Sequence, residues 1–208
     1  MSKKAFIWDL DGTLLDSYDV IVRSLIDTFR EVGIELDYRE VHEHVIRYSV
    51  SNFIKTMEAK TNLKFDNLQA SYKLISAGHQ LDIKLMPNAK EILNKLSMNG
   101  ARHFVYTHRG ITTRPVIENL GIDYSFEEVV TSLNMFPRKP APDAINYIVN
   151  KFGLDKENTY YVGDRSLDME CAKNAGVKGI LFLEPNGVGE PSGFEDYIVS
   201  DLMDIANI

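Results

Sequence analysis

Most informative about the architecture is the segment Ala5-Phe6-Ile7-Trp8-Asp9-Leu10-Asp11-Gly12-Thr13. Its first four residues are all apolar, which is typical of a short strand buried on both faces of a sheet. Because strand side chains alternate, Asp9 and Asp11 share a face. They can therefore reach one crevice at the carboxyl end of the strand, where open α/β sheets bind ligands. The alternative is an ordinary Asp-Gly turn, and this segment alone does not decide between the two.

Similar apolar runs recur along the chain, with helical patterns between them. The predicted strands cover residues 5–8, 103–107, 128–131, 159–163, 179–183 and 197–199. Apolar residues at helical spacing lie between strands, as in residues 89–96 and 145–152. Strands that alternate with helices predict an α/β fold, in which a parallel sheet is covered by helices on both faces.

One interval, from Ser17 to about Lys84, breaks this alternation. Its apolar residues keep helical spacing, and no convincing strand occurs. The predicted helices cover residues 18–32, 40–47, 51–60 and 66–81. A helical block directly after the first strand predicts an inserted all-helical domain, residues 17–83. The core is then formed by residues 1–16 and 84–208.

Composition restricts the classes of function. The 208 residues are 44% apolar and 25% charged, as in soluble globular proteins, and the net charge of -7 argues against a nucleic-acid partner. Asp9 and Asp11 interrupt the first apolar run before a signal peptide or membrane span could form, so no membrane partner is expected. The single cysteine, Cys171, excludes an intrachain disulfide and is expected to be a small buried side chain. These features predict a cytoplasmic protein.

A second acidic group follows the predicted strand at residues 159–163. Asp164 and Asp168 are four positions apart, which is one turn if a helix begins here. Carboxylates from two strand ends would suit Mg²⁺, which prefers oxygen ligands. The alternative is capping of the helix by Asp164 or Ser166, which explains one residue but not the repeated acids at strand ends.

Two further segments offer groups that bind phosphate. Thr107 closes a predicted strand and offers a hydroxyl and the backbone N–H groups that follow it. Lys139 is held extended by Pro140 and could direct its charge at a phosphoryl oxygen. The alternative for Lys139 is a solvated loop lysine.

In this order along the chain, the motifs resemble those of the haloacid dehalogenase superfamily, in particular its phosphoglycolate phosphatase-like members. The motifs are residues 9–13, Thr107, residues 139–143, and Gly163-Asp164 with Asp168, and residues 85–87, Gly121 and 172–176 also match. The resemblance covers nearly the whole chain. It implies a Rossmann-like core with an inserted helical cap. It also implies a magnesium-dependent phosphoric monoester hydrolase that acts on a small phosphorylated metabolite.

The resemblance further implies a role for each motif residue. Asp9 would be the nucleophile that forms an aspartyl-phosphate, and Asp11 would be the general acid and then the general base. The implied metal site consists of Asp9, the backbone carbonyl of Asp11, Asp164 and Asp168. Thr107 and Lys139 would hold the phosphoryl oxygens. For Asp168, support of the metal, orientation of Lys139 and a purely structural role at the helix start all remain open.

Thr13 favours hydrolysis, because the resembling sugar phosphomutases often carry valine at this position. A sugar phosphomutase remains the alternative function, and a non-catalytic regulatory binder is the alternative from another class. The intact residues Asp9, Asp11, Lys139 and Asp164 argue against the binder.

Several residues near the expected site have two interpretations. His108, where the resembling families more often carry asparagine or serine, is either a bystander or a contact to the substrate's leaving group. Arg47, between two helices of the predicted cap, is either a substrate-binding residue or a surface residue. Three further arginines near strand ends are expected to be solvated, although they could also give the site a positive field: Arg109, Arg138 and Arg165.

Overall fold

The computed structural model describes residues 3–184 and 187–208. The chain forms two compact units. The core unit is Met1–Asp16 with Lys84–Ile208, and the helical unit is Ser17–Ile83.

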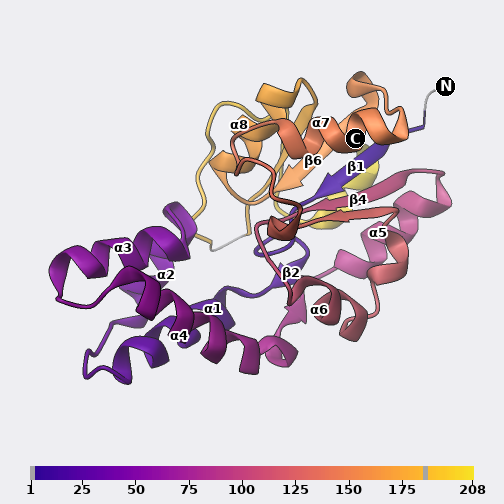
Figure 1. Cartoon of the computed structure of the whole chain (residues 1–208). Helices are drawn as coiled ribbons and strands as arrows, with labels where there is room; N and C mark the ends of the chain where they lie inside the picture. Colours follow the sequence, from indigo (N-terminus) through magenta and orange to yellow (C-terminus); the bar gives the residue numbers. More distant parts are fainter. Residues whose placement is uncertain (1–2, 185–186) are drawn as a thin grey trace. The chain divides into compact units, whose positions relative to one another are not determined.

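A six-stranded parallel sheet forms the centre of the core unit (Figure 1). The strand order is β5-β4-β1-β6-β7-β8. The bounds are β1 Ala5–Trp8, β4 Arg102–Tyr106, β5 Glu128–Val130, β6 Thr159–Gly163, β7 Lys178–Phe182 and β8 Tyr197–Val199. All four residues of β1 are buried, because the strand lies between β4 and β6 and both faces are covered. The predicted parallel sheet is confirmed, and three of its strands end one residue earlier than predicted.

Helices cover both faces of this sheet. The helices are α5 Ala89–Met98, α6 Thr113–Asn119, α7 Asp143–Phe152 and α8 Ser166–Ala175. Short 3₁₀ helices lie at Asp123–Ser125, Ser132–Asn134, Lys156–Asn158 and Leu202–Asn207. Buried residues of α7 and α8 pack with Ile7 and Phe104 in one cluster, while α5 lies on the opposite face (Figure 1).

A small antiparallel pair joins β2 (Leu15–Asp16) to β3 (Lys84–Leu85). This pair was not predicted from the sequence, because strands of two residues show no detectable alternation of apolar and polar residues. The pair holds together the two chain passages between which the helical unit is inserted.

The helical unit contains α1 Tyr18–Arg30, α2 Tyr38–Arg47, α3 Val50–Lys60 and α4 Phe65–Gly78, followed by a 3₁₀ helix at Gln80–Asp82. Its core includes Leu25, Phe29 and Ile54, which are fully buried. The single helix predicted over residues 66–81 is wrong in its last turn, because α4 ends at Gly78. Among the described residues, no helix is long and apolar enough to cross a membrane.

Candidate active site

The first motif forms a tight loop at the end of β1. The backbone N–H groups of Thr13, Leu14 and Leu15 all point to the carbonyl of Leu10, at 2.8–3.1 Å. Gly12 has a φ of 80°, a conformation that favours glycine. Asp9, which immediately precedes this loop, has a side chain that is only 3% exposed, whereas the side chain of Asp11, within the loop, is 25% exposed.

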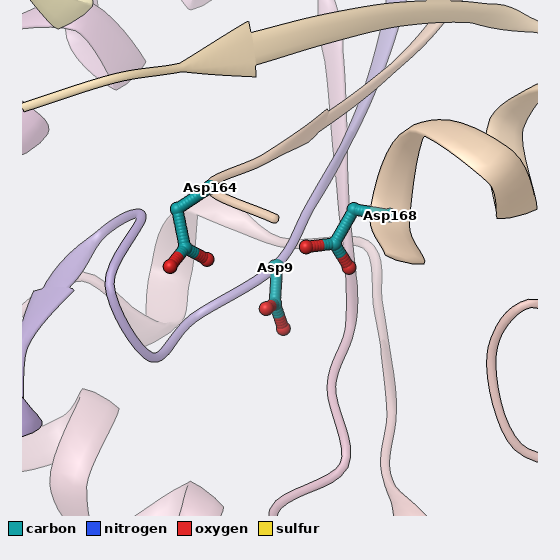
Figure 2. A group of neighbouring side chains, drawn as sticks. All are labelled: Asp9, Asp164 and Asp168. Atoms are coloured by element: carbon teal, nitrogen blue, oxygen red, sulfur yellow. The ribbon is translucent and has the colours of Figure 1, made fainter. Parts of the chain in front are cut away.

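Three carboxylates converge at the carboxyl ends of β1 and β6. Asp9, Asp164 and Asp168 each have an oxygen within 4.8 Å of the others, and Figure 2 shows the three side chains gathered around one space. Asp164 follows β6, and Asp168 lies in the first turn of α8. A Cβ on Gly163 would overlap the side chain of Asp168, so this close approach requires glycine.

Lys139 supplies the positive charge of this cluster. Its side chain is completely buried, with Nζ 3.0 Å from Asp9 Oδ1 and 2.8 Å from Asp168 Oδ1. Burial alone would lower the pKa of Lys139, but the two carboxylates outweigh it and raise the pKa. Lys139 therefore stays charged, and the alternative of a solvated loop lysine is wrong.

Both oxygens of Asp168 already have partners. Oδ1 accepts from Lys139 and from the Tyr161 hydroxyl at 3.1 Å, and Oδ2 accepts the backbone N–H of Arg165 at 3.2 Å. Burial disfavours its ionisation, yet Lys139 and Arg165 hold the pKa of Asp168 below its usual value. These contacts favour orientation of Lys139 over direct metal binding, and Asp168 also contributes to the start of α8.

The cluster fits a divalent cation. Burial raises the pKa of Asp9 to about 6, although the charge of Lys139 opposes this rise. Three buried carboxylates lie within 4.8 Å of one another, and a divalent cation between them would add to Lys139 and Arg165 in favouring their ionised forms. Asp164 Oδ1 accepts from the Thr13 hydroxyl at 3.3 Å, which orients this carboxylate. Hard carboxylate oxygens of this kind suit Mg²⁺.

Thr107 and His108 follow β4 and have different partners. The buried Thr107 hydroxyl accepts the backbone N–H of Arg109 at 3.2 Å, so its own hydrogen can be donated to a phosphoryl oxygen. His108 Nε2 accepts the backbone N–H of Lys139 at 3.1 Å. Burial, reinforced by Lys139, lowers the pKa of His108 to about 3, so the imidazole is neutral near pH 7. The structure thus joins His108 to the Lys139 segment, and contact with a leaving group stays a prediction.

Arg109 differs from what the sequence led us to expect. Its side chain is only 7% exposed, and Nη1 donates to Asp11 Oδ1 at 2.6 Å. The expectation of a solvated arginine is therefore wrong at this position, whereas Arg138 is exposed as expected. Tyr161, which donates to Asp168, was also missed, because it reads as an ordinary buried strand residue.

Arg47 lies in the last turn of α2, in the helical unit, and is exposed. Its predicted contact with substrate stays a prediction.

Comparisons with known proteins identify the family of the chain. The family model described as "Haloacid dehalogenase-like hydrolase" matches residues 6–182. A phosphoglycolate phosphatase of Vibrio cholerae is 31% identical, over 96% of this chain and 93% of that protein. The pyrophosphatase PpaX of Oceanobacillus iheyensis is 24% identical, over 100% of this chain and 97% of that protein.

The fold has close counterparts among solved structures. That of a predicted phosphoglycolate phosphatase from Haemophilus somnus 129pt has a TM-score of 0.86 at 24% identity, covering 100% of this chain and 98% of that one. The comparisons confirm the resemblance to phosphoglycolate phosphatase-like members and the predicted class of phosphoric monoester hydrolase. The chain belongs to the haloacid dehalogenase-like hydrolases.

Proposed function

We propose that this hydrolase is a magnesium-dependent phosphatase that cleaves a small phosphate monoester through an aspartyl-phosphate on Asp9. The observation that carries the proposal is the position of Lys139 Nζ, 3.0 Å from Asp9 Oδ1 in a buried cluster. A buried lysine beside a carboxylate at a strand end can receive a phosphoryl oxygen next to the attacking group. The presence of Asp9, Asp11, Lys139 and Asp164 together argues against a non-catalytic binder.

In the first half of the reaction, an oxygen of Asp9 attacks phosphorus and the bond to the ester oxygen breaks. Lys139 and the Thr107 hydroxyl hold the phosphoryl oxygens, whose charge spreads as the bonds rearrange. Asp11 gives a proton to the departing alkoxide. Its side chain is partly exposed, which suits a group that must reach both substrate and water.

In the second half, Asp11 takes a proton from water as the water oxygen attacks phosphorus, and the bond to Asp9 breaks. Asp9, Asp164 and the backbone carbonyl of Asp11 would hold Mg²⁺, with Asp168 contributing by orienting Lys139. When bound, Mg²⁺ would reduce the repulsion between the phosphate and the carboxylates.

The named relatives support a small anionic substrate, since phosphoglycolate and pyrophosphate both carry a second acidic group beside the transferred phosphoryl group. We propose that the helical unit acts as a cap that influences substrate choice, with Arg47 as its contact. A cytoplasmic location is supported by the single cysteine, Cys171, which is free and buried.

The test is a screen for phosphate release over small phosphorylated metabolites, with Mg²⁺ and with excess chelator. Release should require Mg²⁺ and should be lost in Asp9→Asn, which keeps the size of the side chain but removes the anionic nucleophile. Full activity in chelator would refute the role of the metal. Turnover that needs an activating sugar bisphosphate and releases little phosphate would indicate a phosphomutase instead.

A further inference from the structure

A partly buried ion pair joins the loop after β4 to the first motif. Arg109 Nη1 lies 2.6 Å from Asp11 Oδ1, and the arginine side chain is 7% exposed. A charge-assisted hydrogen bond this short between a shielded guanidinium and a carboxylate restricts the carboxylate to a narrow range of orientations.

Arg109 is itself held at several points. Its Nη2 donates to the Thr112 hydroxyl at 3.3 Å, and its backbone N–H donates to the Thr107 hydroxyl at 3.2 Å. Its carbonyl accepts the backbone N–H of Ser132 at 2.9 Å, which ties the loop after β4 to the loop after β5. The guanidinium is therefore presented to Asp11 from a fixed loop.

The contact makes the two oxygens of Asp11 unequal. Oδ1 accepts an N–H from a permanently charged guanidinium, so a proton on this carboxyl group is carried by Oδ2. The side chain is 25% exposed, which leaves part of the group open to substrate and water. Oδ1 of Asp11 is thus held by Arg109, and Oδ2 is available for proton transfer.

We propose that Arg109 is the positioning residue for Asp11 and that it assigns proton transfer to Oδ2. This rests on the proposed function. In the first half, the Asp9 oxygen bonds to phosphorus, the bond from phosphorus to the ester oxygen breaks, and that oxygen takes the proton from Oδ2. In the second half, water bonds to phosphorus and gives a proton to Oδ2, and the bond between Asp9 and phosphorus breaks. Arg109 transfers no proton in either half.

The test uses esters whose leaving groups need protonation to different degrees. Arg109→Met should lower kcat/KM for an alkyl phosphate by about ten- to a hundredfold, because its alkoxide depends on Asp11. The loss should be small for 4-nitrophenyl phosphate, whose phenolate leaves without help. The loss for the alkyl phosphate should appear mainly in kcat. Arg109→Lys should recover part of this activity, because an ammonium can still donate to Asp11 Oδ1. Arg114→Met, at an exposed position of α6, is the matched control and should behave as wild type.

A double-mutant cycle with Asp11→Asn completes the test. If Arg109 acts through Asp11, adding Arg109→Met to Asp11→Asn should cause little further loss. The inference would be overturned if Arg109→Met lowered kcat/KM equally for all esters, or if it caused the same loss in the Asp11→Asn background. It would also be overturned if the loss were larger for substrates that carry a second negative charge than for those that do not. Wild-type protein that releases no phosphate from any ester would instead refute the proposed function itself, and this inference with it.

Discussion

Replacing Lys139 with methionine should destabilise the metal-free protein strongly. The substitution keeps an unbranched side chain, although a shorter one, and removes the cation between Asp9 and Asp168, whose oxygens lie 3.0 and 2.8 Å from Nζ. All three side chains are at most 3% exposed, so water cannot replace the lost charge. Removing one partner of a buried ion pair costs about 3–5 kcal/mol of unfolding free energy. In a chain of this size, that corresponds to a fall in Tm of about 10 °C.

The loss should depend on pH in a defined direction. Without Lys139, the pKa of the Asp9 carboxyl in the folded protein rises further above its unfolded value. The pKa of the Asp168 carboxyl, which is below its unfolded value in the wild type, rises toward that value. A carboxyl whose folded pKa is raised contributes stability below its unfolded pKa, and this stability is lost as the pH rises through the folded pKa. The Tm difference from wild type should therefore be larger near about pH 8 than near about pH 5.

Thermal unfolding followed by circular dichroism in chelator, at both pH values, measures this difference. Lys151→Met is the matched control, because Lys151 pairs with Glu128 at 2.7 Å but its side chain is 43% exposed. Such an exposed pair contributes little to stability, because solvent screens the two charges. Equal losses for the two variants, or a Lys139→Met deficit that does not change with pH, would refute the reasoning about the buried cluster.

Mg²⁺ should raise Tm more at about pH 8 than at about pH 5, because burial raises the pKa of Asp9 to about 6 and a ligand must be ionised to bind; equal increments would contradict this. Asp9→Asn should raise the metal-free Tm near about pH 8, because it removes a buried carboxylate that is costly to ionise; a lower Tm would count against it. His108→Gln, which keeps an acceptor for the Lys139 N–H, should retain more kcat than His108→Ala, and equal losses would show that this hydrogen bond is unimportant. Arg47→Ala should lower kcat/KM for an anionic metabolite by about ten- to a hundredfold while sparing a neutral-tailed ester, and an equal loss on both would exclude a role in specificity.

The fold could be predicted because apolar residues follow a clear pattern in most of its helices and strands. Residues 5–8 are continuously apolar, and Ile145, Ile148 and Val149 repeat at helical spacing, so a parallel sheet between helices followed directly. The pair of β2 and β3 could not be found, because it joins residues that lie on either side of the whole insertion, Asp16 with Lys84 and Leu15 with Leu85. The end of α4 at Gly78 was missed because the apolar pattern continues into the 3₁₀ helix.

The acidic part of the candidate site was predictable for a similar reason. Asp9 and Asp164 each follow a predicted strand, and parallel strands end at the same edge of the sheet. The orientation of Asp168 toward Lys139 was left open, because the direction of a side chain in the first turn of a helix depends on how the helix packs. In the structure Lys139 is fully buried and contacts both Asp9 and Asp168, and this contact favours a role for Asp168 in orienting Lys139.

The side-chain contacts of the loop after β4 could not be predicted from the sequence. Thr107, His108 and Arg109 are consecutive, yet their partners lie in different parts of the site: the Thr107 hydroxyl bonds within the loop, His108 reaches the backbone of Lys139, and Arg109 reaches Asp11. Outside regular structure no period relates neighbouring side chains, so their directions could not be read from spacing. Because these contacts start from one short loop, a shift of its backbone would move the hydroxyl, the lysine segment and the Asp11 carboxylate together. Substitutions that shift this backbone should therefore affect phosphate binding and proton transfer jointly, whereas Arg109→Met removes only side-chain contacts of Arg109.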